Sequence, residues 1–316
     1  MLHYQTRDDL KSPLTYSKNI VFLETIDKEL IIERYQIYFK IDISRFFKKI
    51  EKIELYRCLD THFVFFYPFN LAGDAEFYDE LQQNDWYNQE WKGEHQIVAH
   101  QFKEKMKVLE VGASIGNFIK PIQKNYPSIE ICGLEMNEKV VKKAQESQLN
   151  IIHESVEEHA KKYENYYDIA CSFQVLEHIT FPIPFLEANI QCLKKGGKLF
   201  CAVPNNDSAI QFTNSILNLP PHHIGLWTKK SLESLEKILP IKLVKFHYEP
   251  LQENYKIYYK KAIFNMRELL YQKRVKKWGQ LGRIINKIMR PFDVKIAHLK
   301  SPTFKNITII AEFEKL

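Results

Sequence analysis

Two acids and a glycine turn stand where a nucleotide-binding site would lie. The stretch VLEVGASIG places Glu110 before Gly112, Ser114 and Gly116. A dinucleotide fingerprint needs G-x-G-x-x-G, because the pyrophosphate must come close to backbone N–H groups that larger side chains obstruct. Ser114 and Asn117 occupy two of those three glycine positions, and no G-K-[ST] follows. The turn therefore predicts neither a dinucleotide site nor a P-loop.

The charge of Glu110 indicates which ligand the turn favours. A carboxylate two residues before the first glycine repels phosphate and attracts a cation. S-adenosylmethionine carries an ammonium and a sulfonium and no phosphate, so the acid favours that cofactor over NAD or ATP. Glu135, 23 positions after Gly112, stands where a carboxylate can accept hydrogen bonds from both ribose hydroxyls.

Three histidines supply candidate bases for the acceptor. Transfer of a methyl group from a sulfonium is an in-line displacement, so the protein mainly positions the acceptor. A hydroxyl or carbon acceptor must also lose a proton, and histidine is the residue best suited to take it. The candidates are His178 in LEHI and the pair His222–His223 in LPPHHIGLWT. Helix-start signals at Thr228 and Ser231 place that pair on a loop before a helix.

Alternating strand and helix patterns from about residue 105 must position these residues. Near-continuous apolar runs, typical of strands covered on both faces, occupy 107–112, 128–135, 150–155, 167–174 and 197–204, and two later strands are expected at 242–250 and 306–315. Helical patterns lie between them at 137–148, with Asn137 as N-cap, and at 185–196, with Gly196 as the stop. The order predicts a doubly wound α/β fold with a mostly parallel sheet.

The four motifs together resemble the class I S-adenosylmethionine-dependent methyltransferases. VLEVGASIG is similar to their first motif, ICGLEMN to the second-strand motif, YDIACSFQVLEHI to the fourth and LKKGGKLFCAVPN to the fifth. The resemblance covers roughly residues 85–250 and the final strand. It implies a Rossmann-like sheet of seven strands with helices on both faces, and S-adenosylmethionine as cofactor. Ser114 departs from the family, which has its middle glycine there.

The resemblance also implies a role for each matching residue. Glu110 and the 112–116 turn, with Gly112, Ser114 and Gly116, would hold the methionine end of the cofactor. The remaining cofactor contacts would be Glu135 on the ribose, Met136 on the adenine face, Ser155 and Val156 at the adenine edge, and Gln174 near the methyl group. For Met136 and Val156 the alternative is simple core packing.

The segment that carries His222 and His223 resembles a narrower group of methyltransferases. PHHIGLWT is similar to the E-H-x-x-Y-F-S segment of sugar C-methyltransferases, which makes His223 the matching base, although His222 replaces the preceding glutamate. We therefore expect O- or C-methylation of a small-molecule, sugar or glycan acceptor, with His223 and His178 as candidate catalytic residues. The alternative is that the histidines only pack and cap their loop, and that His178 supports the shape of the site.

Three segments are expected along the chain. Residues 1–75 form an accessory region with a helical pattern at 27–40 and a hairpin at 53–68. The hairpin resembles the zinc module of some sugar methyltransferases but keeps only Cys58 of its cysteines, so we predict no metal site. Residues 76–104, which include Trp86 and Tyr87, should form one connecting helix. Residues 105–316 form the methyltransferase domain.

Composition places the chain among cytoplasmic proteins. It has 316 residues, 45% hydrophobic and 27% charged, a length that suffices for a full core without disulfides. Neither a signal peptide nor a bilayer-spanning apolar run is evident. The five cysteines lack any C-x-x-C pair, and we expect them to be reduced core residues. The sequence leaves the oligomeric state open.

The basic charge is concentrated in one insertion, expected as a helical lid over 252–303. Residues 256–300 contain 13 Lys or Arg against only Glu268 and Asp293. Within VKKWGQLGRIINKIMR, a single helical face would carry the apolar side chains Trp278, Leu281, Ile285 and Ile288.

Three uses of this insertion stay open. It could contact an anionic membrane or an acidic glycan, it could pack on its own domain, or it could bind nucleic acid, for which no recognised module is present. Two alternative functions remain: a nucleic-acid methyltransferase that uses residues 256–300, and a non-catalytic binding or scaffold protein whose cofactor site Ser114 has weakened.

Overall fold

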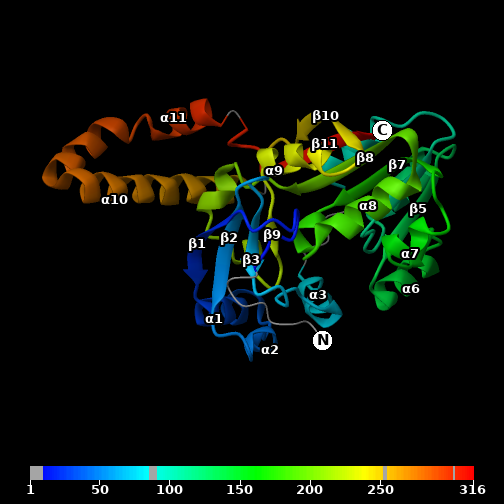
Figure 1. The fold of residues 1–316 in the computed structure, drawn as a ribbon, viewed down its shortest axis with the longest axis horizontal. Helices are drawn as coiled ribbons and strands as arrows, with labels where there is room; N and C mark the ends of the chain where they lie inside the picture. The colour runs from blue at the N-terminus through cyan, green and yellow to red at the C-terminus, as the bar shows by residue number, and fades with distance from the viewer. Residues whose placement is uncertain (1–9, 85–90, 252–254, 302) are drawn as a thin grey trace.

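A mixed sheet of seven strands lies on the right-hand side of Figure 1. The computed structural model describes residues 10–84, 91–251, 255–301 and 303–316. The strand order is β10-β11-β8-β7-β4-β5-β6. The strands are β4 (Lys107–Val111), β5 (Glu130–Glu135), β6 (Ile151–His153), β7 (Tyr167–Phe173), β8 (Leu193–Pro204), β10 (Ile241–Tyr248) and β11 (Thr308–Lys315).

The register confirms the predicted doubly wound topology. Strands β4 to β8 pair in parallel, and β11 runs antiparallel between β8 and β10. Apolar side chains alternate between the two faces of the sheet, as Leu109 and Val111 join one core cluster and Val108 the other. The core on the first face includes residues of α7 (Val156–Ala160) and α8 (Pro182–Cys192). The opposite core includes residues of α4 (Gly93–Ala99), α5 (Ile119–Asn125) and α6 (Glu138–Glu146).

Two predicted helix limits can be compared with the structure. Asn137 caps α6, because its side chain accepts from the amides of Lys139 and Val140. The predicted stop at Gly196 is wrong, since α8 already ends at Cys192. Leu193 pairs with Tyr167 and starts β8, so ladder hydrogen bonds replace the last helical turn expected there.

The expected single helix over 76–104 is also wrong for the described residues. The segment contains two short helices, α3 (Ala75–Leu81) and α4 (Gly93–Ala99). Each has its own start, because Asp74 caps α3 and the amide of Gly93, at the start of α4, donates to Glu249. Trp86 and Tyr87 lie outside the described residues.

A second sheet, ordered β1-β2-β3-β9, carries the accessory region. Its strands are β1 (Ile20–Ile26), β2 (Ile53–Cys58), β3 (Val64–Tyr67) and β9 (Gly225–Leu226). The predicted hairpin is confirmed as the antiparallel pair β2–β3, and the predicted helix as α1 (Lys28–Phe39) with Asp27 at its N-cap. α2 (Ser44–Phe47) follows α1. Because β9 comes from the chain after β8, this sheet ties the accessory region to the loop that carries His222 and His223.

The remaining described elements are short. They are the helix α9 (Lys229–Glu233) and the 3-10 turns η2 (Leu176–His178), η3 (Ala209–Phe212), η4 (Ile216–Asn218) and η5 (Ser234–Lys237).

The five cysteines are all buried free thiols, as expected of core residues: Cys58, Cys132, Cys171, Cys192 and Cys201.

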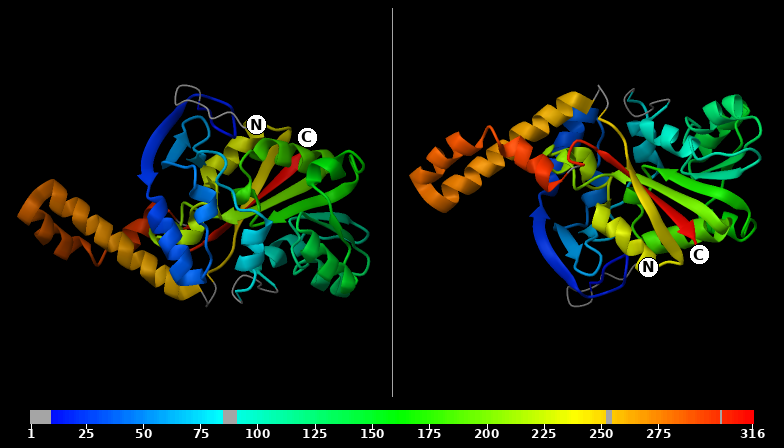
Figure 2. Two further views of the ribbon diagram at one scale, coloured as in Figure 1. Left: turned by 90° about the horizontal axis from the view of Figure 1, so that it is seen from below. Right: turned by 90° about the horizontal axis from the view of Figure 1, so that it is seen from above.

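The basic insertion forms a helical arm, defined here as α10 (Lys256–Met289) with α11 (Asp293–Lys300). Figures 1 and 2 show it projecting away from the seven-stranded sheet. Only its base packs on the domain, where Ala262 and Met266 share a core cluster with Ala209 and Phe304. Gly279 has φ 57° and ψ −129°, which breaks α10 and the single apolar face expected from Trp278 to Ile288. Nothing helical among the described residues is both long and apolar enough to cross a bilayer.

Candidate active site

One cavity of about 980 Å³ opens at the carboxyl ends of the parallel strands, where ligands of open α/β sheets bind. It is lined by ten of the eleven residues predicted for the site: Glu110, Gly112, Ser114, Glu135, Met136, Ser155, Val156, Gln174, His178 and His223. Gly116 is the exception and does not line the cavity. The residues from Glu110 to Gln174 in that set are called the cofactor half below.

The glycine turn after β4 needs its two glycines for backbone and packing reasons. Gly112 and Gly116 have φ of 82° and 83°, in the left-handed region that favours glycine. A Cβ on Gly112 would lie 2.4 Å from Val175, and one on Gly116 would lie 2.4 Å from Leu149. Gly116 thus shapes the turn from outside the cavity. Ser114 also has positive φ, 48°, which is uncommon for a residue with a side chain.

Glu135 closes the turn at the end of β5. Its Oε2 accepts a hydrogen bond from the Ser114 amide at 2.9 Å. Its Oε1 accepts from the amides of Met136 and Asn137 at 2.8 and 2.9 Å. Three backbone donors fix the carboxylate at the cavity wall, and carboxylate oxygens have further lone pairs for hydroxyl donors.

The residues expected around the adenine differ in burial. Met136 is 64% exposed at the cavity wall, so it is not a core residue and its side chain is available to a ligand. Val156 is buried and joins the core, while Ser155 caps α7 by accepting from the Glu158 amide. Val156 therefore lines the cavity and packs in the core at once.

Buried acids line the cavity between the turn and β7. Glu110 is 4% exposed, and its Oε2 has no hydrogen-bond partner within the described chain. Burial, helped by the nearby charge of Glu135, raises the pKa of Glu110 well above its ordinary value. Glu94 on α4 is buried too, and its Oε2 accepts from the Gln174 side chain at 2.7 Å. Burial raises the pKa of Glu94 as well.

This donor and acceptor set fits S-adenosylmethionine. The orphaned Glu110 oxygen can accept from an ammonium, and the acids give the wall a negative character that suits a sulfonium. Glu135 offers the hydroxyl acceptors, and Met136 offers an exposed apolar surface.

Three histidines meet on the other side of the cavity. His178, His222 and His223, called the histidine cluster below, each offer one ring nitrogen within 4.8 Å of the others. The His222 and His223 rings stack with centroids 4.5 Å apart, and His178 stands edge-on to both. Two separate segments, η2 and the loop before β9, thus build one group.

Hydrogen bonds to oxygen set the tautomer of each imidazole. His178 Nδ1 bonds the His222 carbonyl, His222 Nδ1 bonds the Leu217 carbonyl at 2.9 Å, and His223 Nδ1 bonds Asn218 Oδ1 at 3.1 Å. Because these oxygens only accept, each Nδ1 must be the protonated nitrogen. Burial lowers the pKa of His178 to about 4 and of His222 to about 3, and it lowers the pKa of His223 well below its ordinary value. The rings are therefore neutral near pH 7.

Glu177 lies beside the cluster and was missed as a site residue. Its side chain is 1% exposed, and neither carboxylate oxygen has a hydrogen-bond partner among the described residues. Oε1 is 4.0 Å from Nε2 of both His178 and His223. Burial raises the pKa of Glu177 to about 8. The only sequence signal was its place in the LEH motif.

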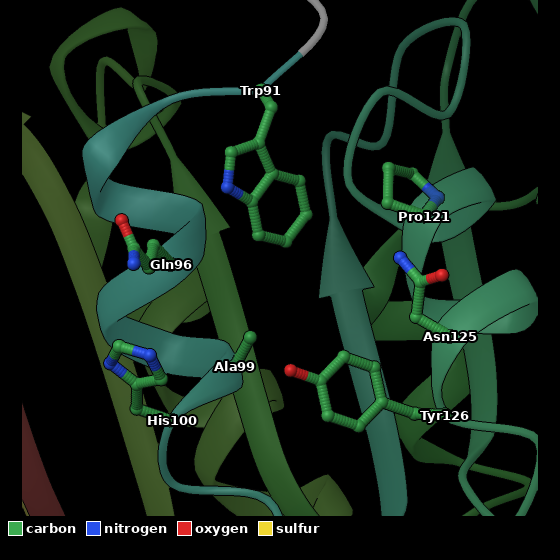
Figure 3. Close-up of a pocket in the computed structure, with 7 residues that line it drawn as sticks. All are labelled: Trp91, Gln96, Ala99, His100, Pro121, Asn125 and Tyr126. Carbon is green, nitrogen blue, oxygen red and sulfur yellow. The ribbon is translucent and has the colours of Figure 1, made fainter.

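Other site residues gave no sequence signal, because tertiary structure alone brings them in. Glu94 comes from α4 and Lys92 from its N-cap, whereas Tyr258 and Tyr259 come from the base of the helical arm and Tyr255 from its N-cap. A second hollow of about 600 Å³ lies between α4 and α5, lined by Trp91 and Tyr126 among others (Figure 3). It contains none of the predicted site residues.

Known proteins with similar sequences are methyltransferases. A family profile described as a methyltransferase domain matches residues 84–237. The ubiquinone biosynthesis O-methyltransferases of Yersinia enterocolitica and Erwinia tasmaniensis are 25% and 28% identical over 170 residues, which cover 48% of this chain and 69% of each relative.

A solved structure shares the fold. An S-adenosylmethionine-dependent methyltransferase from Archaeoglobus fulgidus superposes with a TM-score of 0.52 at 18% identity, over 77% of this chain and all of the other. The strand order, the four sequence motifs at the strand ends and the matching family profile all indicate the same family. The matched domain, residues 84–237, therefore belongs to the class I S-adenosylmethionine-dependent methyltransferases.

Proposed function

We propose that the protein transfers the methyl group of S-adenosylmethionine to a hydroxyl oxygen of a small-molecule acceptor. The observation that carries this proposal is the single cavity, which joins the cofactor half to the histidine cluster. A ligand between them would place its reacting oxygen next to three imidazoles. The relatives named O-methyltransferases support oxygen rather than carbon as the acceptor atom.

Each predicted residue keeps its role in this proposal. Glu110 holds the ammonium, the backbone of Gly112 and Ser114 surrounds the methionine end, and Glu135 accepts from the ribose hydroxyls. Met136 and the edge formed by Ser155 and Val156 flank the adenine, and Gln174, fixed by Glu94, lies near the methyl group. Gly116 supports the turn by packing against Leu149.

The reaction needs little covalent help from the protein. The acceptor oxygen forms a bond to the methyl carbon as the carbon–sulfur bond breaks, and sulfur keeps the bonding pair as a thioether. The acceptor hydroxyl loses its proton toward the histidine cluster, where His223 and His178 face it. A buried imidazole with a strongly lowered pKa accepts a hydrogen bond readily but is a weak base on its own.

The acceptor wall is rich in aromatic and aliphatic side chains. Tyr258 and Tyr259 of the arm, Leu217 and Ile210 line the same cavity as the histidines. Such a wall suits an acceptor with an apolar or aromatic body and one reacting hydroxyl, and the named role of the relatives in ubiquinone biosynthesis agrees with that chemistry. A sugar or glycan hydroxyl is the second acceptor class to be tested.

Mass spectrometry distinguishes these acceptors. Metabolites and glycans from cells with and without the protein are compared for a difference of one methylene, about 14 daltons. The proposal predicts methylated phenolic or quinol-type compounds only when the active protein is present. Methylated glycans alone would move the acceptor to the sugar class, and methylated RNA or DNA alone would overturn the small-molecule proposal.

We also propose that the helical arm contacts an anionic membrane surface. Basic residues greatly outnumber acids over 256–300, and the arm leaves large apolar side chains exposed: Ile257, Phe264, Trp278, Leu281, Ile284, Ile288, Phe292 and Leu299. Basic charge beside exposed apolar groups suits an anionic lipid interface.

Vesicle sedimentation tests the arm. Full-length protein should sediment with vesicles that contain phosphatidylserine and not with purely zwitterionic vesicles. Replacing Ile284 and Ile288 by serine should reduce the bound fraction several-fold at unchanged net charge. Equal binding to both vesicle types, or steeply salt-dependent binding to RNA without vesicle binding, would contradict the membrane assignment.

A further inference from the structure

The histidine cluster and Glu177 have the composition of a metal centre. Three imidazoles and one carboxylate converge at one side of the cavity, with the histidine ring nitrogens within 4.8 Å of one another. Glu177 Oε1 is equally far, 4.0 Å, from Nε2 of His178 and of His223. Imidazole and carboxylate ligands together suit divalent first-row transition metals.

The orientation of the imidazoles supports ligation. In each ring Nδ1–H donates to an oxygen, so the lone pair resides on Nε2. Ligating histidines in proteins almost always donate their other ring nitrogen to a carbonyl, carboxylate or water, which fixes the tautomer and the ring orientation. Here the acceptors are the carbonyl of His222, on the loop before β9, and two groups of η4, the carbonyl of Leu217 and the amide oxygen of Asn218.

The burial of Glu177 is a second, independent reason to expect a bound cation. A buried carboxylate normally has hydrogen-bond donors, because burial without them costs several kcal/mol. Glu177 is 1% exposed, and both of its oxygens are without hydrogen-bond partners in the described chain. The nearest ring nitrogens of His178 and His223 carry lone pairs rather than protons, so they do not stabilise an ionised Glu177. A cation between them would.

We propose that His178, His222, His223 and Glu177 bind one divalent transition-metal cation, and that the acceptor hydroxyl takes a further coordination position on it. Bonds of about 2.1 Å require ligand atoms roughly 3–3.5 Å apart, so the cluster contracts by about 1 Å on binding. A coordinated hydroxyl loses its proton more easily, which removes the need for a strong base. His223 then acts as a ligand instead of a lone general base. The catalytic part of this inference rests on the proposed function.

Cobalt titration tests the site without any acceptor. Full-length protein is stripped with a chelator and titrated with Co²⁺, whose visible absorption reports nitrogen and oxygen coordination. We expect one Co²⁺ per chain and displacement of the absorption by Zn²⁺. Absence of stoichiometric binding by the wild-type protein would overturn the proposal, whatever the variants do.

Matched variants locate the ion. Glu177→Gln and His223→Asn should each weaken Co²⁺ binding at least tenfold, whereas His100→Asn, an exposed histidine outside the cluster, should leave it unchanged. Calorimetry with S-adenosylhomocysteine checks that each variant keeps a folded cavity. Equal Co²⁺ affinity in all three variants would place the ion elsewhere and contradict the assignment.

Turnover separates the metal site from the function. If the stripped protein methylates its acceptor as fast as the metal-loaded protein, the catalytic part of the proposal is wrong. If Co²⁺ binds at the cluster but no acceptor is ever methylated, the metal site stands and the proposed function fails. Loss of turnover on stripping with recovery on adding Zn²⁺ or Mn²⁺ supports both.

Discussion

The two sides of the cavity are built in different ways. The cofactor half consists of residues at or just after the ends of the strands β4, β5, β6 and β7, so each strand brings its own contact. The histidine cluster joins η2 to a loop 44 residues later in the chain, and that loop is held by β9 in the accessory sheet. The first side depends on local turn chemistry, and the second depends on how the two sheets are joined.

This difference implies that cofactor binding and acceptor chemistry can be lost separately. Backbone amides fix the cofactor half. The Glu135 carboxylate, for example, accepts hydrogen bonds from three of them. The histidine cluster is fixed by side-chain bonds to one loop. Substitutions on either side should therefore leave the other side intact.

The largest effect is expected at the histidine cluster. His223→Asn should lower turnover at least about 100-fold, the range typical of losing a group that assists proton removal, and change cofactor affinity less than about twofold. Acceptor turnover and calorimetry with S-adenosylhomocysteine measure the two quantities. A His223→Asn protein with wild-type turnover, or with lost cofactor binding, would break the separation of the two sides.

Glu135 should give the opposite pattern. Glu135→Ala removes the predicted acceptors of two ribose hydroxyl bonds, each worth about 1.5–3 kcal/mol when the acceptor is charged, so the Kd for S-adenosylhomocysteine should rise at least about 100-fold. Glu146→Ala on the exposed side of α6 is the control. Unchanged affinity in Glu135→Ala would refute the ribose assignment.

Glu110 couples cofactor binding to stability. Burial raises the pKa of Glu110 in the folded protein, and the charges of Glu135 and Glu94 raise it further. The charge of Lys92 acts in the opposite direction. The Cys171 thiol is a further neighbour of Glu110. A carboxyl with a raised folded pKa makes the protein less stable as pH rises above about 4.5. Glu110→Gln should therefore melt at a higher temperature than wild type at pH 8, with a smaller difference at pH 5.

The same substitution should weaken cofactor binding several-fold, because an amide attracts the ammonium less than a carboxylate does. Scanning calorimetry without ligand at the two pH values gives the stability difference, and each kcal/mol corresponds to roughly 2–4 °C for a domain of this size. A Glu110→Gln protein that is less stable than wild type at pH 8 would show that the carboxylate has a compensating partner.

The smallest effect is expected at Ser114. The Ser114 contact to Glu135 uses the backbone amide, which glycine retains, so Ser114→Gly should change cofactor affinity by less than about threefold. Ser114→Val should be worse, because a β-branched residue at φ 48° is strained. Parallel calorimetric titrations of the two variants check this order, and equal losses in both would assign the hydroxyl itself a binding role.

The same comparison explains which parts of the structure the sequence predicts correctly. Gly112, Glu135 and Asn137 are read correctly because each acts within a few residues of its own strand. Gly196 and the 76–104 segment are misjudged because strand pairing and separate helix caps override local helical patterns. The break at Gly279 shows that an apolar helical face requires an unbroken helix.

The acceptor side lies beyond such local patterns. His178 and His223 were singled out individually, but their meeting depends on the parallel crossover from β7 to β8 and on β9 pairing with β3. Glu177 was passed over within the LEH motif, and only the structure shows that it is buried beside two imidazoles without a hydrogen-bond donor among the described residues. Chemistry that depends on contacts between distant segments is set by the tertiary fold.

Calorimetric titration of the full-length protein with S-adenosylmethionine tests the central claim most directly. The account predicts heat that saturates at one cofactor per chain, with a large loss of affinity in Glu135→Ala and a wild-type value in His223→Asn. Absence of heat at millimolar cofactor would contradict the assignment of the cavity and with it the proposed methyl transfer.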